Sequence, residues 1–234
     1  MCAIELVSFD ESGLALQRSS ANERLWATDR GLAVLLTVRD TSPVFPASFG
    51  DELALWKAYR RIVPAEEQGL VELARVTASG RPALRFITKR VMDPSTGWGR
   101  TFLGILQIPF RDCSILIKAE CSELSATGAR ETSVIHRLLG AGQLGFRPVP
   151  PEEASRIRGP ADMEGWLVDP EDPTPAHLAC NVSDDPRYDQ EFAEHPLSLV
   201  RAFLDRTQSS IALAPPLGAL PVYAGKARRW WQAW

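Results

Sequence analysis

Four strand-like segments follow one another between residues 70 and 120, and only short turns separate them. Each is rich in aliphatic and β-branched residues, as strands often are. The segments are Leu70 to Ala78, Ala83 to Val91, Arg100 to Ile108 and Cys113 to Glu120. Parallel strands would need crossover connections of a dozen or more residues, and the turns here are shorter. The spacing therefore predicts an antiparallel sheet, with Ser79-Gly80-Arg81-Pro82 as a hairpin turn.

Helical periodicity lies on either side of this run of strands. From Asp51 to Arg61 apolar residues recur three apart, which is typical of one helical face, and Ser48 or Asp51 can cap its start. A second helix begins at Thr127-Gly128, and Gly140 is placed to end it as a left-handed cap. A third helix, Pro196 to Gln208, is too short to be stable alone in water, so we expect it to dock on the main domain.

Two more strands are expected near the N-terminus, at Leu25 to Thr28 and Leu32 to Val38, and residues 3–8 are a further candidate. Together these elements predict an α+β fold with an antiparallel sheet of about six to seven strands flanked by helices. Prolines become frequent after about Phe146. We therefore expect a sheet domain over residues 1–147 and, over residues 148–234, an irregular Pro-rich extension that packs on it and carries one helix.

The order of the elements, a hairpin, a helix, a four-stranded meander and a second helix, resembles the Mog1/PsbP-like α+β fold. Three short motifs carry the likeness, which covers residues 1–145: Trp56-Lys57-Ala58-Tyr59, Gly80-Arg81-Pro82-Ala83-Leu84 and Thr127-Gly128-Ala129-Arg130-Glu131. Members of that fold are mostly binding or accessory proteins without shared catalytic residues. The resemblance thus implies a binding protein, and it transfers no site residue.

Charge and hydropathy restrict the partners and the compartment. The formal net charge is −3 and the pI about 5.7, so no overall basic field favours nucleic acid. No apolar run reaches the ~20 residues of a membrane helix, and the N-terminus lacks the pattern of a secretory signal. We therefore expect a cytoplasmic protein in which all four cysteines are reduced. Cys113 and Cys121 would lie along one strand, too far apart to bridge.

Residues 140–145, Gly140-Ala141-Gly142-Gln143-Leu144-Gly145, match the letters of the dinucleotide motif G-x-G-x-x-G. That motif binds pyrophosphate because it follows a strand and opens a helix. Here a predicted helix comes before it and a Pro-rich segment after it. We expect a helix end and a connector that binds no nucleotide.

Side chains for metal binding or covalent catalysis are sparse. His177 and Cys180 could present two metal ligands, but zinc needs three or four, and no partner pair has suitable spacing. His136 is expected on the surface, and His195 as a cap or neighbour of the helix that starts at Pro196. The sequence has no Gly-x-Ser-x-Gly nucleophile elbow. We expect no catalytic residue, no cofactor and no metal.

Two groups of residues are candidates for binding. Arg85 and Lys89 share one face of their strand, and Lys118 and Glu120 share a face of theirs, so a register that aligns the two faces would create one polar patch. Such a patch is either a binding surface or the commoner cross-strand charge pairing at a solvent face. The second group is the tail, in which three tryptophans stand beside three basic residues: Lys226, Arg228, Arg229, Trp230, Trp231 and Trp234.

Tryptophan and arginine are enriched at protein interfaces, and they also suit membrane surfaces and single-stranded nucleic acid. The tail could instead fold back over the core. Because its charges are costly to desolvate, we expect it to contact a partner protein. The leading hypothesis is a non-catalytic adaptor of bacterial type that acts through protein–protein contacts. The alternative is a small-molecule-binding enzyme with a site between the sheet and the C-terminal segment, which a pocket formed by Arg85, Lys89 and Glu120 would favour.

Overall fold

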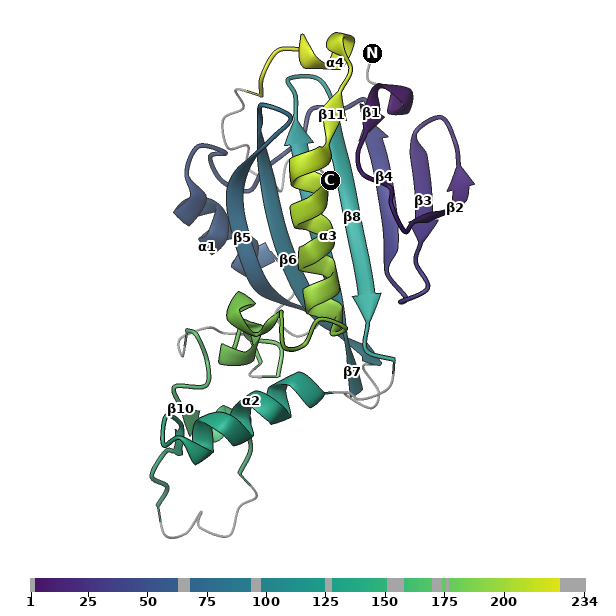
Figure 1. Ribbon diagram of the computed structural model, residues 1–234. Helices are drawn as coiled ribbons and strands as arrows, with labels where there is room; N and C mark the ends of the chain where they lie inside the picture. Colours follow the sequence, from purple (N-terminus) through teal and green to yellow (C-terminus); the bar gives the residue numbers. More distant parts are fainter. Residues whose placement is uncertain are drawn as a thin grey trace.

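A seven-stranded antiparallel sheet organises the structure (Figure 1), a computed structural model that describes residues 3–62, 68–93, 98–124, 128–150, 158–169, 174–175 and 177–223. The strands lie in the order β2-β3-β4-β8-β7-β6-β5. Their bounds are β2 (Ala15–Ser19), β3 (Glu23–Ala27), β4 (Ala33–Arg39), β5 (Gln68–Ala78), β6 (Arg81–Asp93), β7 (Trp98–Pro109) and β8 (Ser114–Ser122). The predicted antiparallel sheet and α+β class are confirmed. The edge strand β2 was not predicted, since all its residues are exposed and it shows no buried face.

Helices and short elements complete the described part. The α-helices are α1 (Glu52–Ile62), α2 (Ala129–Gly140), α3 (Pro196–Ser210) and α4 (Pro215–Gly218). Two small ladders pair β1 (Val7–Ser8) with β11 (Ala212–Leu213), and β9 (Gly145–Phe146) with β10 (Met163–Glu164). The 3₁₀ turns are η1 (Ile4–Leu6), η3 (Pro160–Asp162), η4 (Val182–Asp184) and η5 (Pro186–Tyr188). None of the described helices combines the length and the apolar character that crossing a membrane would require.

The hairpin between β5 and β6 turns on two residues. Ser79 and Gly80 have φ values of 49° and 70°, so both adopt the left-handed conformation of a type I′ turn. Arg81 and Pro82, which the sequence assigns to the turn, already belong to β6. The hairpin itself is where the sequence predicts it.

The ends of the helices confirm one cap and correct another. Asp51 caps α1, because its Oδ1 accepts a hydrogen bond from the Ala54 N–H at 2.9 Å. Gly140, expected as a left-handed cap, is instead the last residue of α2. The left-handed residue is Gly142, with φ 67°, two positions further on.

One face of the sheet packs against α3, which contacts β7 and β8 and runs alongside β8 (Figure 1). Val200, Phe203 and Leu204 of the helix are buried in the main core. The helix approaches the sheet closely at Gly104, since a Cβ on that residue would come 2.5 Å from the Val200 Cγ1 atom. The predicted C-terminal helix therefore lies on the sheet.

The opposite face is covered only in part by the described elements. Around α1, which packs on β5, a second core gathers residues from the 45–55 segment and from strands β5, β6 and β7: Phe45, Phe49, Leu55, Leu70, Leu73, Leu84, Phe86 and Ile105. On β3, β4 and β8 the side chains of this face remain partly exposed, among them Leu25, Leu35 and Lys118. This uncovered part is named the open sheet face, and its central residues are Leu25, Leu35, Leu103, Lys118 and Glu120.

The helix α2 does not lie against the sheet, contrary to the expectation of two helices on it. Its apolar stripe, Val134 and Leu138, packs with Leu144, Met163, Trp166 and Tyr188 in a third, separate core. This small subdomain lies below the sheet in Figure 1. The apolar stripe of an amphipathic helix must be buried against other apolar side chains, and for α2 these come mainly from the segment that follows it.

The segment before α3 contacts the edge of the sheet directly at Gly69 in β5. A Cβ atom at this position would lie 1.8 Å from the Leu178 carbonyl oxygen and 2.7 Å from its carbon. Real Cβ atoms do not approach backbone so closely, so either β5 or the 177–180 segment would have to move.

We therefore expect Gly69→Ala to lower the free energy of unfolding by about 1–3 kcal/mol, the range of overpacked sites. Urea denaturation measures the change. The matched control is Gly140→Ala, where a Cβ meets nothing within 4 Å and helix propensity favours alanine by roughly 0.5–1 kcal/mol. Equal effects of the two variants would show that the Gly69 contact is not tight in solution.

The cysteines correct one expectation. Cys121 and Cys180 carry free thiols, as expected, and Cys121 is buried in the main core with Ile115 and Ile117. Cys113, however, is disulfide-bonded. The distance along the strand excludes a bridge between Cys113 and Cys121. It does not exclude a bridge from Cys113 to another cysteine, so the expectation that all four cysteines are reduced was wrong.

Candidate functional site

The sheet register separates the four charged residues that the sequence groups together. Arg85 of β6 is aligned through Leu106 with Ile117 of β8, and these three lie on the face that α3 covers. Lys118 is the next residue along β8, so it points to the opposite face, with Glu120 two positions further on. Arg85 and Lys89 therefore do not share a patch with Lys118 and Glu120. A pocket formed by Arg85, Lys89 and Glu120 is not possible in this fold.

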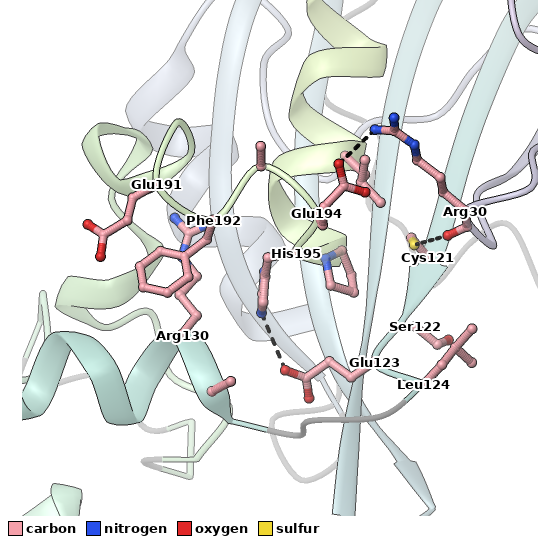
Figure 2. A pocket seen from close by; sticks show the side chains of 14 residues that line it. Arg30, Cys121, Ser122, Glu123, Leu124, Arg130, Glu191, Phe192, Glu194 and His195 are labelled. Carbon is pink, nitrogen blue, oxygen red and sulfur yellow. Dashed lines mark hydrogen bonds and ion pairs between the residues drawn. The ribbon is translucent and has the colours of Figure 1, made fainter.

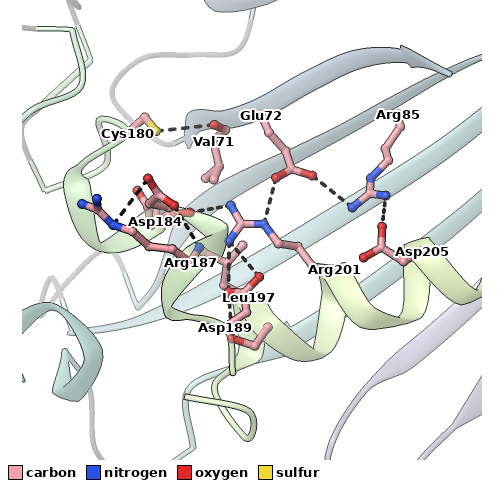
Figure 3. A network of polar contacts seen from close by, with 12 residues as sticks. Val71, Glu72, Arg85, Cys180, Asp184, Arg187, Asp189, Leu197, Arg201 and Asp205 are labelled. Atoms are coloured by element: carbon pink, nitrogen blue, oxygen red, sulfur yellow. Dashed lines mark hydrogen bonds and ion pairs between the residues drawn. The ribbon is translucent and has the colours of Figure 1, made fainter. Parts of the chain in front are cut away.

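Arg85 belongs to a network of ion pairs between the sheet, α3 and the segment before α3 (Figure 3). Lys89 pairs with Asp184 of that segment. Arg85 pairs with Glu72 at 3.3 Å and with Asp205 of α3. The Lys89 Nζ lies 2.6 Å from Asp184 Oδ2, and these side chains are 1% and 3% exposed. These contacts hold the extension to the sheet.

Two arginines extend this network towards α2 and α3. Arg201 of α3 donates to Glu72 at 2.8 Å and to Asp189 at 3.1 Å. Arg130 of α2 pairs with Asp189 at 2.8 Å and donates to the Ser183 carbonyl at 2.6 Å. Buried charges persist where they are paired and hydrogen-bonded, so the network is explained by packing without a ligand.

Lys118 and Glu120 lie on the open sheet face. Lys118 stands between Leu35 of β4 and Ile105 of β7, and Glu120 between Ala33 and Leu103. Glu120 also pairs with Arg90 at 3.2 Å, and their side chains are 43% and 48% exposed. The result is a partly exposed surface that mixes aliphatic and charged side chains.

A cavity of about 560 Å³ opens between the end of β8, the start of α2 and the residues before α3 (Figure 2). Its lining includes charged, apolar and thiol side chains, among them Arg30, Cys121, Glu123, Arg130, Glu194 and His195. Glu194 forms an ion pair with Arg30 at 3.0 Å. The cavity lies at the junction of the sheet and the C-terminal segment.

Glu123 and His195 form the most buried polar pair in this cavity. The His195 Nε2 lies 3.3 Å from Glu123 Oε1, and the two side chains are 9% and 3% exposed. Backbone amides also hold Glu123: Gly128 donates to Oε1 at 3.2 Å and Arg100 to Oε2 at 2.9 Å. The carboxylate is thus fixed by neutral donors.

The tautomer of His195 follows from its role as the cap of α3. Its Nδ1 accepts the Leu197 N–H at 3.2 Å, as the sequence predicts for a residue before Pro196. A nitrogen that accepts a hydrogen bond carries no proton, so the ring proton is on Nε2 and is donated to Glu123. A protonated ring would direct a second N–H at the Leu197 amide.

The thiol that lines the cavity, Cys121, is not an activated nucleophile. Burial raises the pKa of the Cys121 thiol above its usual value, and the sulfur donates to the Arg30 carbonyl. Nucleophilic cysteines need a lowered pKa, because the thiolate is the reactive species. Cys121 is therefore a core thiol, as the sequence predicts.

A second cavity, of about 350 Å³, lies on the other side of the first turn of α2. Trp166 and Ile135 line its apolar part, and Arg100, Glu131 and His177 are among its polar residues. Burial, and then the charges of Arg100 and Lys89, lower the pKa of His177. Its imidazole is accordingly neutral at pH 7.

The remaining sequence candidates lie apart from both cavities or outside the description. His136 is exposed on α2, as expected. The Gly140–Gly145 motif begins at the last residue of α2 and ends in β9, so no helix follows it. The tail residues Lys226, Arg228, Arg229, Trp230, Trp231 and Trp234 lie outside the described residues.

Sequence reasoning missed Glu123 and Glu131, and it treated His195 only as a cap. Glu123 follows β8 and Glu131 lies in the first turn of α2, but His195 is 72 positions from Glu123 in the chain. No local spacing links residues so far apart. The weak signals available were an acidic residue at a strand end and another at a helix start.

Comparisons with known proteins give matches among solved structures alone. No protein-family model and no curated protein matches the chain. Among solved structures, a mutant of protein Mog1 matches with 10% identity and a TM-score of 0.42, covering 92% of this chain and 94% of that one. The Saccharomyces cerevisiae Ran-binding protein Mog1p matches with 9% identity and a TM-score of 0.43, covering 91% and 93%.

Both matches are Mog1 structures. Likeness at this level concerns the arrangement of the chain and says nothing of what this protein binds.

Proposed function

We propose that the protein is a non-catalytic binding protein, an adaptor, that contacts another protein through the open sheet face. The observation that carries the proposal is a partly exposed surface over β3, β4 and β8, on the side of the sheet opposite α3. Protein interfaces combine an apolar core with a polar, solvent-accessible rim. Leu25, Leu35 and Lys118 form one cross-strand row of it.

The tail is proposed as a second part of the same contact. The described chain ends at Tyr223, whose ring lies 5.3 Å from Phe45 and 5.8 Å from Phe49. Those phenylalanines belong to the α1 core, on the same side of the sheet as Lys118 and Glu120. Tyr223, the last described residue, therefore lies on the side of the proposed surface.

Charge reversal on the open sheet face tests the proposal. Native complexes would be purified from the source cell with the wild-type chain, with Lys118→Glu/Glu120→Lys, with a deletion of residues 226–234, and with Arg187→Glu as control. Arg187 is exposed on η5, away from this surface. We expect at least one protein to co-purify with the wild type and with the control but not with the double variant or the deletion. The unfolding midpoints of all four chains should be the same.

Two outcomes contradict the proposal. One is a set of co-purified proteins that is the same for all four chains. The other is that deletion of the tail lowers folding stability but no complex is lost. The tail would then cover the core instead of contacting a partner.

The cavity beside Glu123 supports a second candidate function, a small-molecule-binding enzyme with its site between sheet and C-terminal segment. The volume of about 560 Å³ is in the range of ligand sites. Binding of a small molecule that shifts the His195 ring resonances, and that Arg30→Ala weakens, would favour it.

The expected cytoplasmic location is a separate point. The disulfide at Cys113 does not fit a compartment that keeps thiols reduced.

A further inference from the structure

Two carboxylates and an imidazole meet in the wall between the two cavities. One ligand atom each from Glu123, Glu131 and His195 lies within 4.8 Å of the other two. Glu123 and His195 line the larger cavity, and Glu131 lines the smaller one. The cluster is therefore bordered by a cavity on each side, although Glu123 itself is almost fully buried.

Among the described residues, neither Glu123 nor Glu131 forms an ion pair with an arginine or a lysine, although Arg100 lines the smaller cavity beside Glu131. Glu123 accepts only from two backbone amides and from the neutral His195 ring. The Oε2 atom of Glu131 is buried and has no hydrogen-bond partner. Two carboxylates at this distance repel each other, and a buried acceptor without a partner is costly. A bound positive charge would relieve both costs.

We propose that Glu123 and Glu131 bind a hard divalent cation, of the Mg²⁺ or Mn²⁺ class, and that His195 orients Glu123 without ligating the ion. Carboxylate oxygens are the ligands these cations prefer, and such ions commonly keep several waters beside one or two carboxylates. The flanking cavities of about 560 and 350 Å³ provide room for those waters.

The exclusion of His195 from the coordination sphere follows from the cap of α3. Its Nδ1 accepts the Leu197 N–H, so the proton occupies Nε2, the nitrogen that faces Glu123. Ligation through Nε2 would require the ring proton to be on Nδ1. The Nδ1–H and the Leu197 N–H would then point at each other, and both are hydrogen-bond donors. Zinc, which favours nitrogen and sulfur ligands, is therefore not the expected ion.

The test uses the full-length protein and Mn²⁺ as the probe. Free Mn²⁺ is measured by electron paramagnetic resonance at increasing metal concentration, and the thermal midpoint is recorded with Mn²⁺ and with chelator. We expect one bound ion per chain and a midpoint that rises with Mn²⁺. Glu131→Gln should weaken binding at least about tenfold and abolish the rise. The matched control is Glu164→Gln, because Glu164 is exposed on β10.

Glu131→Gln carries a second expectation with the opposite sign. With chelator present, the variant should melt at a higher temperature than the wild type, because the amide removes a charge and can donate to Glu123. The proposal is overturned if Mn²⁺ binds equally to Glu131→Gln and wild type, or if no ion binds. Nitrogen modulation in the spin-echo signal from a directly bound imidazole would overturn the role given to His195.

Discussion

Lys89→Met is expected to lower the free energy of unfolding by about 3–5 kcal/mol, since removing one partner leaves the other as an uncompensated buried charge. Lys89 and Asp184 lie 2.6 Å apart and are almost completely buried. Methionine fills a similar volume but cannot neutralise Asp184, which would keep only the Asn181 N–H as a donor to Oδ2. Equilibrium denaturation in urea measures the loss.

The control and the rescue separate charge from packing. Lys118→Met alters a partly exposed lysine of the open sheet face and should change stability by no more than about 0.5 kcal/mol. Adding Asp184→Asn to Lys89→Met should recover a substantial part of the loss, because the amide still accepts from Asn181 without a charge. A double variant as unstable as the single one would show that the cost comes from packing.

Phe203→Ala should cost about 3–5 kcal/mol, the range for a large aromatic residue in a well-packed core. Phe203 is 2% exposed in the main core and meets Phe9 edge-on at 6.1 Å. It belongs to α3, which connects the C-terminal segment to the sheet. The loss should appear as a lower denaturation midpoint and faster amide exchange in α3.

Leu53→Ala is the matched control for this prediction. Leu53 is on the helical stripe that the sequence assigns to α1, yet it is 63% exposed. Its truncation should change stability by less than about 0.5 kcal/mol. An unchanged midpoint for Phe203→Ala would mean that α3 is not docked on the sheet in solution.

The candidate site could be predicted only in part, and the charged residues of the sheet show why. On β8 the apolar residues Ile115, Ile117 and Cys121 make one face obvious, so Lys118 and Glu120 must occupy the other. On β6 both faces are buried, with Phe86 in one core and Ile87 in the other. Alternation therefore cannot show which face holds Arg85 and Lys89, and only the register with β7 decides it.

The cap at His195 illustrates the same limit at the level of one residue. Its position before Pro196 is a local signal, and the hydrogen bond to Leu197 confirms it. Its contact with Glu123 depends on how the end of β8 and the start of α3 meet in space. A residue's backbone role can thus be read from neighbours in the chain, while its chemical partner cannot.

By itself, the sequence determined the antiparallel order of the strands, the β5–β6 hairpin, the main helices and the apolar stripe of α3. These depend on turn residues and on periods of two and of 3.6, which act over a few positions. Tertiary structure alone decided that α2 leaves the sheet and that α3 covers it, and it also decided that Lys89 meets Asp184 and that Glu123, Glu131 and His195 converge. Lys89 and Asp184 are 95 positions apart and Glu123 and His195 are 72 apart, and no local pattern links residues at such separations.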